Sequence, residues 1–524
     1  MRKENHFSPI IFAIILIAGI WLGYSLNFSS SNNTQESNKF NLILHQLEEL
    51  YVDSLAKEEL VEKAIENLLT ELDPHSSYIP AKDLEAINEP MEGSFDGIGV
   101  EFNLKDDTIL VVAPISGGPS ERVGIRAGDK IVRVDGEVIA GTNLTNQKVF
   151  DLLRGERGTK VVVGILRVGE KELIDFDITR GKIPIHSIDV AYMVDHELGY
   201  IKVNRFSATT YDEFKVASEG LLNEGMQKLL LDLRNNPGGY LGAAINMANE
   251  FLDDNKLIVY TEGRSREKEE YFSNVSGRLL GTEVVVLIDE GSASASEIVA
   301  GALQDNDRGI VAGRRSFGKG LVQEQFELHD GSAFRITTQR YYTPTGRCIQ
   351  KPYENGNKDS YDNDWMTRLE SGELTSKDSI NFIDSLMFFT PQGKVVYGGG
   401  GIMPDVFIPL DTNSYHQSIA KANRKDLVRS FAFNYTNLHR EELEKLKLKD
   451  FIKYYVIDNK AWSALAKQCA EAGIELEINE LTLKDKKIIS TQLKAFIARN
   501  IWNDFGFYPI IHQIDGTFQE AIRL

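Results

Sequence analysis

The chain has 524 residues, which is too long for a single hydrophobic core, so we expect several domains. Its 42% of hydrophobic and 26% of charged residues are typical of a folded globular protein, and the net charge of −19 argues against a nucleic-acid partner, which needs a basic face. The two cysteines, Cys348 and Cys469, allow one disulfide or none, and none of the nine histidines lies at metal-ligand spacing, so we expect neither a metal nor a cofactor.

The first 28 residues predict a membrane anchor. Arg2 and Lys3 precede the apolar run Ile10–Leu22, which is typical of a secretory signal or of a single membrane span. No A-x-A site closes the run, so we favour an uncleaved anchor that leaves the rest of the chain exported. A polar linker covers residues 29–37. We therefore expect a protein of the cell envelope, held in the inner membrane and facing the periplasm.

Residues 38–90 are expected to form a small helical module. Apolar residues recur at helical spacing over Asn38–Tyr51 and Lys57–Glu71. The module ends in LDPHSSYIP, residues Leu72–Pro80. Because His75 lies beside a proline turn, we interpret it as a local hydrogen-bonding residue and not as a catalytic histidine.

Residues 91–181 consist of short strands and many glycines. The sequence Gly97-Ile98-Gly99-Val100 precedes an alternating strand, and a helix is predicted over Asn146–Leu153. Glycines leave successive backbone N–H groups free to hold a terminal carboxylate, and the strand that follows offers an edge to an extended peptide. This segment resembles a PDZ domain, which implies that it binds the C-terminal tails of proteins.

Residues 182–410 contain two similar strand–turn–helix units. The buried strand Leu229–Arg234 runs into the turn 235–239, NNPGG, and the buried strand Val284–Asp289 runs into the small-residue turn 290–295. A helix follows each turn. Such repeats predict a mostly parallel α/β sheet that carries both turns at its carboxyl edge, where backbone N–H groups face a ligand.

The second turn carries three hydroxyls, and a single lysine follows it. Ser292, Ser294 and Ser296 lie together, and Lys319 lies between two glycines 25 residues after the middle serine. We interpret this pattern as a serine nucleophile with a lysine base. Serines also cap helices, which is the simpler explanation of the turn alone. The segment Gly313–Gly320 nearly matches a phosphate loop, but it lacks the final hydroxyl and a predicted strand follows it instead of a helix.

Several motifs now stand in one order: LDPHSSY, LDLRNNPGG, GSASASEIVAGALQD, FGKGLVQ, RITTQRYYTPTGR and GIMPD. With the PDZ-like segment they resemble the C-terminal processing proteases, also called tail-specific proteases, of peptidase family S41, over about Asn38–Leu410. The resemblance implies that Ser294 is the nucleophile, that Lys319 is the base and that Gln323 orients the lysine. It further implies that the N–H groups of Ala295 and of Gly238 or Gly239 form an oxyanion hole. Glu297 and Asp305 are the two supporting acids that it implies.

The residues agree with such a mechanism, since a lysine serves as a base only when it is neutral. Lowering its pKa from about 10.4 to roughly 7–8 requires on the order of 4 kcal/mol, which burial beside Phe317, Leu321 and Val322 would supply. We therefore predict a serine endopeptidase that cleaves exported proteins near C-terminal tails captured by the PDZ-like domain. The alternatives are a catalytically silent PDZ scaffold and, more remotely, a P-loop NTPase.

Two regions depart from the family pattern. About fifty residues, 348–398, separate the Tyr-Tyr-Thr-Pro-Thr-Gly-Arg stretch from the Gly-Ile-x-Pro-Asp motif, and we expect this insertion to form a lid or a contact surface. Residues 411–524 are amphipathic and predict a small helical domain used for packing or for forming a homo-oligomer. The whole chain is thus expected to be a multidomain α+β protein.

Overall fold

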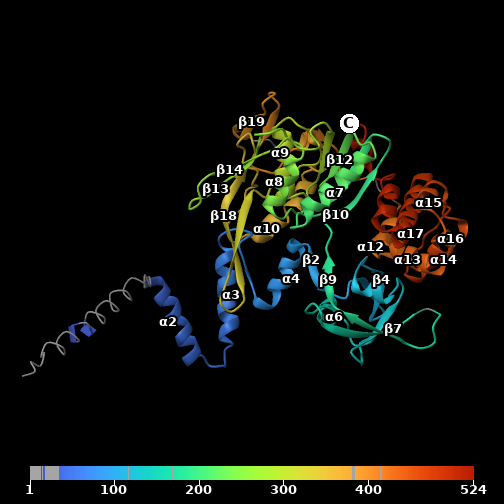
Figure 1. Cartoon of the computed structure of the whole chain (residues 1–524), viewed down its shortest axis with the longest axis horizontal. Helices are drawn as coiled ribbons and strands as arrows, with labels where there is room; N and C mark the ends of the chain where they lie inside the picture. Colours follow the sequence, from blue (N-terminus) through green and yellow to red (C-terminus); the bar gives the residue numbers. More distant parts are fainter. Residues whose placement is uncertain are drawn as a thin grey trace, which may run out of the picture. The chain divides into compact units, whose positions relative to one another are not determined.

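The computed structural model describes residues 13–14, 16–17, 35–115, 117–167, 169–380, 384–412 and 416–524 (Figure 1). It divides into two compact units, Met1–Leu69 and Thr70–Leu524. The predicted anchor and the polar linker lie almost entirely outside the described residues. Within the described ranges, no helix combines the length and the apolar character that crossing a membrane requires.

The N-terminal unit contains two amphipathic helices at the predicted places. They are α2 (Gln35–Leu50) and α3 (Lys57–Thr70), and α3 continues one residue beyond the unit. A salt bridge of 2.6 Å joins Lys57 Nζ at the start of α3 to Glu48 Oε2 near the end of α2.

The PDZ-like domain is an antiparallel sheet in the order β3-β4-β5-β7-β8, with β6 paired to β5. Among the described strands, β3 pairs with β4 alone, so its other edge has no strand partner. A short ribbon of β2 (Ser94–Gly97) and β9 (Gly181–Pro184) leads into and out of the domain, close to the predicted boundaries. The other elements are β3 (Val100–Lys105), β4 (Thr108–Pro114), α5 (Pro119–Val123), β5 (Lys130–Val134), β6 (Glu137–Val138), α6 (Asn146–Leu153), β7 (Lys160–Leu166) and β8 (Ile174–Thr179).

The α/β domain, called the core below, contains the predicted mostly parallel sheet, in the order β10-β11-β12-β15-β16-β21. Only the pair β10–β11 is antiparallel. Alternate residues face opposite layers: Leu229 and Leu231 pack under the helices α7, α8 and α9, whereas Leu230 packs with α18 on the other face. The strands are β10 (Ile188–Met193), β11 (Leu198–Val203), β12 (Lys228–Asp232), β15 (Glu283–Ile288), β16 (Ile310–Gly313) and β21 (Val406–Phe407), and the helices are α7 (Thr210–Asn223), α8 (Leu241–Asn249), α9 (Ala295–Asp305) and α18 (Gly516–Ala521).

A second sheet of the core differs from the expected domain division. LDPHSSYIP was expected to end the helical module, but Ser77–Ile79 form strand β1, which pairs with β18 of the core. The helix α4 (Ala81–Glu92) then leads to the PDZ-like domain. The remaining strands of this sheet are β13 (Leu257–Glu262), β14 (Glu269–Phe272), β17 (Leu321–Glu327) and β18 (Ala333–Tyr342).

The insertion is folded. It contains α10 (Lys358–Asp362), α11 (Asp364–Glu370), two 3-10 helices, η1 (Lys377–Ser379) and η2 (Asp384–Leu386), and the hairpin of β19 (Met387–Phe389) and β20 (Val395–Tyr397).

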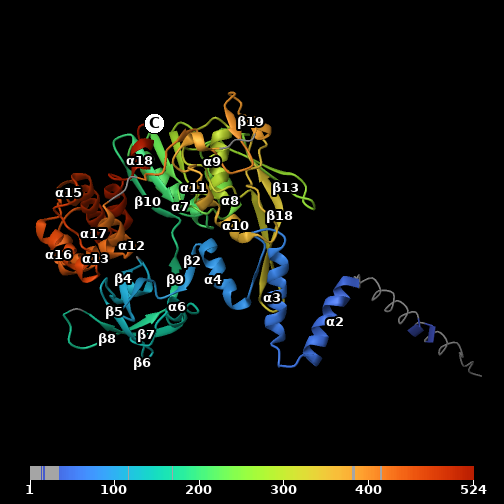
Figure 2. The same cartoon turned by 180° about the vertical axis from the view of Figure 1, so that it is seen from behind.

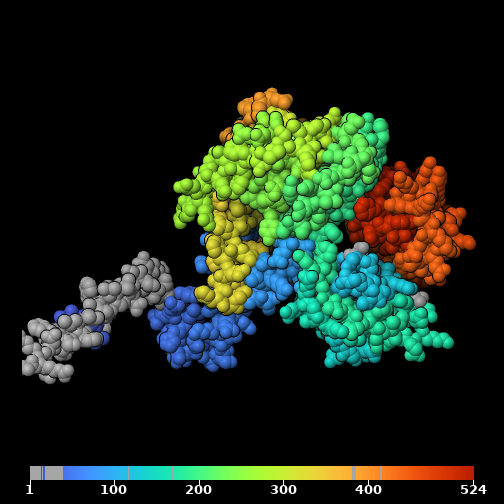
Figure 3. All heavy atoms as spheres, viewed as in Figure 1, coloured from blue at the N-terminus to red at the C-terminus, as the bar shows by residue number. Residues whose placement is uncertain are grey.

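The C-terminal region is helical, as predicted, with a core of its own that includes Trp462, Leu465 and Leu493. Most of its atoms gather in one lobe, coloured orange to red (Figure 3). The helices α12 and α13 are separated by Asp426, which adopts a φ of 56° between them. The last helix, α18, lies against β16 (Figure 2). The other helices are α12 (Gln417–Arg424), α13 (Leu427–Leu438), α14 (Arg440–Leu443), α15 (Leu448–Tyr454), α16 (Asn459–Glu471) and α17 (Leu483–Ile511).

The two cysteines do not form a disulfide: Cys469 is a buried thiol of the C-terminal domain, and Cys348 is a half-buried thiol at the start of the insertion.

Candidate active site

The turn between β15 and α9 carries Ser294 in a strained conformation. Its φ of 54° and ψ of −112° lie outside the regions that side chains other than glycine normally adopt. In hydrolases a nucleophile on a strained strand-to-helix turn has its hydroxyl exposed above the sheet. The turn therefore has the geometry that presents a nucleophile.

The structure also separates the three serines. Ser292 is buried and its hydroxyl donates to the carbonyl of Leu233 at 2.8 Å, and Ser296 is buried and donates to the carbonyl of Asn236 at 2.9 Å. Both hydroxyls hold the two turns together. The hydroxyl of Ser294, which is half-buried, is the one left for chemistry.

Glu297 joins the serine turn to the lysine corner. Its fully buried carboxylate accepts hydrogen bonds from the N–H groups of Ser294 (2.7 Å), Gly318 (2.7 Å) and Lys319 (2.9 Å) and from the hydroxyl of Ser316 (2.5 Å). Burial raises the pKa of Glu297 to about 7, and these hydrogen bonds oppose the rise. The predicted supporting acid thus holds both reactive segments at once.

Lys319 lies in a partly dry environment. Burial lowers the pKa of its ammonium below the ordinary value, and the positive charge of Arg335 lowers it further, while Glu297 and Asp73 act in the opposite direction. The hydroxyl of Tyr341 donates to the carbonyls of both Ser294 and Lys319. Within the described part of the chain, the side chains of Ser294 and Lys319 share this site without a hydrogen bond between them.

The turn 235–239 packs directly on Ser294. A Cβ added to Gly238 would lie 2.8 Å from both Ser294 Cβ and the nitrogen of Ala295, so only glycine fits. The N–H of Gly238 already donates to Asn236 Oδ1 at 2.9 Å. Of the two glycines proposed for an oxyanion hole, Gly239 is therefore the better candidate, since its N–H donates no hydrogen bond to any other described residue. It lies at the same carboxyl edge as the N–H of Ala295 at the start of α9.

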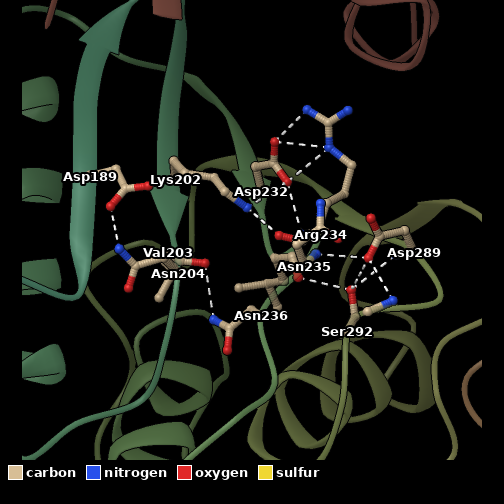
Figure 4. Close-up of polar contacts among 12 residues, drawn as sticks. Asp189, Lys202, Val203, Asn204, Asp232, Arg234, Asn235, Asn236, Asp289 and Ser292 are labelled. Atoms are coloured by element: carbon tan, nitrogen blue, oxygen red, sulfur yellow. Dashed lines mark hydrogen bonds and ion pairs between the residues drawn. The ribbon is translucent and has the colours of Figure 1, made fainter. Parts of the chain in front are cut away.

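Polar side chains at the ends of β11, β12 and β15 hold this turn in place (Figure 4). Asp289 accepts a hydrogen bond of 2.8 Å from the N–H of Asn235, and Asn236 Nδ2 donates to the carbonyl of Val203 at 3.0 Å. Sequence analysis did not single out Asp289 or Asn236. The signal was their position at the carboxyl ends of two buried strands, where polar residues are exceptional unless they have a structural or functional partner.

Within the described residues, no hydrogen bond joins Gln323 to Lys319, and the role of Gln323 stays a prediction. Its amide donates to the hydroxyl of Thr337 at 3.3 Å. Strand β17 begins at Leu321, and its register with β18 shifts between Val322 and Gln323. In an unbroken strand the side chains of residues 319, 321 and 323 would point to one face. This irregularity interrupts the alternation of side chains.

Asp305 lies at the far end of α9, away from the serine turn. Its carboxylate is fully buried and forms an ion pair of 2.6 Å with Arg347, and it also accepts hydrogen bonds from the N–H and hydroxyl of Thr345. It fixes the Thr-Pro-Thr-Gly-Arg turn onto α9. No group of three or more potential metal ligands is present within the described ranges.

The glycine loop of the PDZ-like domain opens the edge strand β3. The carbonyl of Ile98 accepts hydrogen bonds from the N–H and hydroxyl of Ser120, at 3.0 and 2.7 Å, which fixes the loop. Gly99 has a φ of 75°. Between β3 and α6, the rings of Phe102 and Phe150 lie 5.9 Å apart in an edge-to-face contact. Loop, strand edge and helix thus have the arrangement that an extended peptide needs.

Arg154 lies directly behind this loop, and sequence analysis missed it. Its Cα is 3.7 Å from the position of a Cβ on Gly97, and its guanidinium lies over the rings of Phe95 and Phe150. It pairs with Glu89 of α4 at 2.5 Å. Among the described residues, its Nε is buried without a hydrogen-bond partner, although the guanidinium is paired with Glu89 through Nη1. An unsatisfied N–H donor at an N–H-rich loop favours an anionic ligand.

Comparison with known proteins agrees with this architecture. Residues 197–356 match the model of peptidase family S41, residues 110–167 match a PDZ domain, and residues 418–503 match a family of unknown function (DUF8443). The photosystem II D1 C-terminal processing protease is a solved structure with 28% identity and a TM-score of 0.36, covering 72% of this chain and 94% of that one.

Two further relatives are similar over most of their length. A carboxy-terminal-processing protease of Bartonella bacilliformis is 37% identical over 350 residues, which cover 64% of this chain and 80% of that protein. A probable CtpA-like serine protease of Staphylococcus saprophyticus is 34% identical over 356 residues, which cover 66% of this chain and 71% of that protein. The chain therefore belongs to peptidase family S41, as a serine-type carboxy-terminal-processing protease with a PDZ domain.

Proposed function

We propose that this protease cuts exported proteins near their C-terminal tails, with Ser294 as nucleophile and Lys319 as general base. The observation that carries the proposal is the carboxylate of Glu297, which accepts the backbone N–H groups of both residues and so fixes them in one site. The strained backbone of Ser294 supports the choice of nucleophile. Its hydroxyl accepts the N–H of Glu297 in a capping box, whereas the hydroxyls of Ser292 and Ser296 donate their protons to backbone carbonyls.

The reaction needs a proton to move in each of its steps. The neutral amine of Lys319 takes the proton of the Ser294 hydroxyl as the oxygen attacks the scissile carbonyl, and the resulting ammonium donates that proton to the leaving amine. Water then gives a proton to the amine, attacks the acyl-enzyme and restores the serine. The N–H groups of Ala295 and Gly239 are the proposed donors to the oxyanion.

The lowered pKa of Lys319 supports its role as the base and predicts how kcat/KM depends on pH. Only the uncharged amine accepts a proton, so kcat/KM rises as pH increases through the pKa of the lysine in the free enzyme. Because burial moves this pKa downwards, the rise occurs at a lower pH than for an exposed lysine.

The proposed selectivity comes from the PDZ domain. The loop Gly97–Val100, the open edge of β3 and the guanidinium of Arg154 together offer N–H groups, a strand partner and a positive charge to a free C-terminus. The proposed location is the cell envelope, with the apolar run Ile10–Leu22 as the membrane anchor and the catalytic part exported.

The dyad is tested by the cleavage of an unfolded model protein such as reduced, carboxymethylated α-lactalbumin. Ser294→Ala and Lys319→Ala are each expected to lower kcat/KM by at least about 10³-fold, because either change removes proton transfer to or from the nucleophile. Lys256→Ala, which replaces an exposed lysine of the same domain, serves as the matched control and keeps full activity.

The fold of each variant is checked by circular dichroism. Full turnover by folded Lys319→Ala contradicts the proposed base. Turnover by Ser294→Ala that is lost in Ser292→Ala or Ser296→Ala moves the nucleophile to another position of the turn.

A further inference from the structure

The insertion contacts the segment that carries Lys319 on both sides of the lysine. Before it, Arg368 of α11 donates to the carbonyl of Arg315 at 2.6 Å and to that of Ser316 at 3.1 Å. Arg368 is only 3% exposed and is held by Glu373, which also pairs with the side chain of Arg315 at 2.7 Å. A buried guanidinium from the insertion thus fixes the backbone three and four residues before the lysine.

The two glycines that flank Lys319 are bonded to the first residues of the insertion. The N–H of Lys351 donates to the carbonyl of Gly318 at 2.9 Å. The N–H of Gly320 donates to Gln350 Oε1 at 2.8 Å. Both neighbours of the lysine therefore depend on partners that lie in the insertion.

The side chain of Tyr361 closes the same corner. Tyr361 is 4% exposed, and its ring meets the rings of Phe317 and His75 edge to face at 5.5 and 5.2 Å. Its hydroxyl is 3.1 Å from His75 Nε2 and 3.2 Å from Gln350 Nε2. The ammonium of Lys351 lies 3.8 and 4.0 Å from the centres of the Phe317 and Tyr361 rings.

We propose that the insertion is part of the catalytic apparatus, and that Tyr361 is a positioning residue that keeps water away from Lys319. The inference rests on the proposed Ser294–Lys319 dyad. It assigns the insertion a task at the active site, in place of the lid or contact surface expected from the sequence.

The charges around the lysine limit what the insertion can contribute. The groups that act on Lys319 are Arg335 of β18, Glu297 of α9 and Asp73 before β1. Nearby lie His75, whose pKa is lowered to about 3 by burial and then by Lys319, the phenols of Tyr341 and Tyr361, and Lys351. His75 is thus neutral, and the ammonium of Lys351 is directed at aromatic rings, at the Tyr361 carbonyl and at the Asp364 carboxylate, 3.3 Å away. The charge of Lys358 in α10 also acts on His75 and lowers its pKa. The insertion acts by excluding water and fixing the backbone.

This role makes a directional prediction. Removing the Tyr361 ring admits water, which stabilises the charged ammonium and raises the pKa of Lys319. Since only the neutral amine is active, the rising limb of kcat/KM then moves to higher pH. A shift of about one unit corresponds to a roughly tenfold loss of kcat/KM at a pH below both values.

The experiment measures kcat and KM of the full chain on a peptide with a free C-terminal acid, between pH 6 and 10 in steps of about half a pH unit. Tyr361→Ala is expected to move the rising limb upwards by about one unit, with KM within about twofold of the wild type. Tyr361→Phe keeps the ring and is expected to restore the wild-type limb. Trp365→Ala, at a 49% exposed position of α11, is the matched control with an unchanged profile.

A folded Tyr361→Ala enzyme with the wild-type limb overturns the inference and leaves the dyad intact. Tyr361→Val takes its place if the alanine variant does not fold, and the same shift decides. Lys319→Ala in the same series separates the two proposals, because turnover without the lysine overturns the dyad itself.

Discussion

At the scale of single residues, Glu297 links stability and catalysis. Its carboxylate lies at the start of α9 and accepts four donors from two segments that are distant in the sequence. An ionised carboxylate has enough lone pairs for all four, whereas a protonated one must donate at least one hydrogen bond. The protonation state of this one buried group therefore decides whether both reactive segments are held.

The first prediction concerns Glu297 and pH. Its pKa rises from 4.5 in the unfolded chain to about 7 in the fold, so between these values the native state binds more protons than the unfolded state. The contribution of this group to stability is then present below pH 4.5 and is lost as pH rises through about 7, by on the order of 3 kcal/mol in total.

Glu297→Gln removes this titration. Urea unfolding of the variant is expected to lack the decline in stability that wild type shows between pH 5 and 8 from this group. The variant is also expected to lose kcat by at least about tenfold, because an amide offers one acceptor oxygen where two were used. Equal slopes of stability against pH in both proteins contradict the assignment.

The second prediction concerns Gly239. Its φ of 146° is a conformation of glycine, and an added Cβ would collide with the carbonyl of Phe206. Gly239→Ala is expected to displace the turn 235–239, which carries the proposed oxyanion donor, and to lower kcat by about 10²–10³-fold with a smaller effect on KM. Gly242→Ala, in a helix position with open space around it, is the control and should keep activity.

Residue types and their order pointed to the candidate residues of the site, but not to the hydrogen bonds between them. The three serines are equivalent as helix caps in the sequence. The structure distinguishes them because the hydroxyls of Ser292 and Ser296 donate to the carbonyls of Leu233 and Asn236, which lie far from them in the chain. The shift of register beside Gln323 leaves no mark in the residue pattern, since it is set by pairing with β18. Tyr361 lies in a segment for which the family pattern offers no counterpart.

At the scale of elements, long periodic segments were predicted well and short pieces were not. The helix over Asn146–Leu153 and the buried strands of the parallel sheet follow from local pattern alone. Strand β1 has three residues, and its partner β18 lies more than 250 positions away in the chain, so no local signal defines it. Helix α18 was likewise not expected, and yet it covers one face of the central sheet.

The third prediction concerns α18. Phe518 is 2% exposed and packs on Tyr200, with ring centres 5.6 Å apart, beneath the parallel sheet. Phe518→Ala is expected to cost about 3–5 kcal/mol of unfolding free energy through lost burial and the cavity left behind. Leu524→Ala, six positions later and 48% exposed, should change stability by less than about 0.5 kcal/mol.

Urea denaturation followed by tryptophan fluorescence measures both variants. The ion pair of Arg234 with Asp515, at 2.9 Å, connects the start of α18 to the residues between β12 and the turn 235–239. A loss of stability in Phe518→Ala is therefore expected to be accompanied by a lower kcat. Unchanged stability contradicts the view that α18 completes the core.

At the scale of the whole molecule, the PDZ domain is inserted into the catalytic chain through a single ribbon. Gly97 at the end of β2 and Gly181 at the start of β9 are directly paired, so the domain begins and ends at neighbouring points. The proposed substrate selection and the proposed cleavage thus lie on parts of the chain with separate hydrophobic cores. The PDZ domain has its own core, which includes Ile109, Val134 and Val163.

The last prediction uses this geometry. Replacing residues 98–180 by Asn-Gly would close β2 and β9 into a two-residue hairpin, which matches their antiparallel register. The core that remains keeps Ser294, Lys319 and Glu297, so we expect it to fold and to cut unfolded protein. It should lose the capture of free C-termini, because the replacement removes Arg154 and leaves only Gly97 of the loop Gly97–Val100.

The measurement compares kcat/KM for one peptide as the free acid and as the C-terminal amide. The full chain is expected to prefer the acid by about 10–100-fold, the value of one or two charge-assisted hydrogen bonds, and the shortened chain by less than about twofold. Arg154→Ala in the full chain should lie between the two, because it removes the cation and leaves the N–H groups of the loop. A strong preference for the acid in the shortened chain would show that the catalytic core itself recognises the carboxylate, and selectivity would then have to be sought near Ser294.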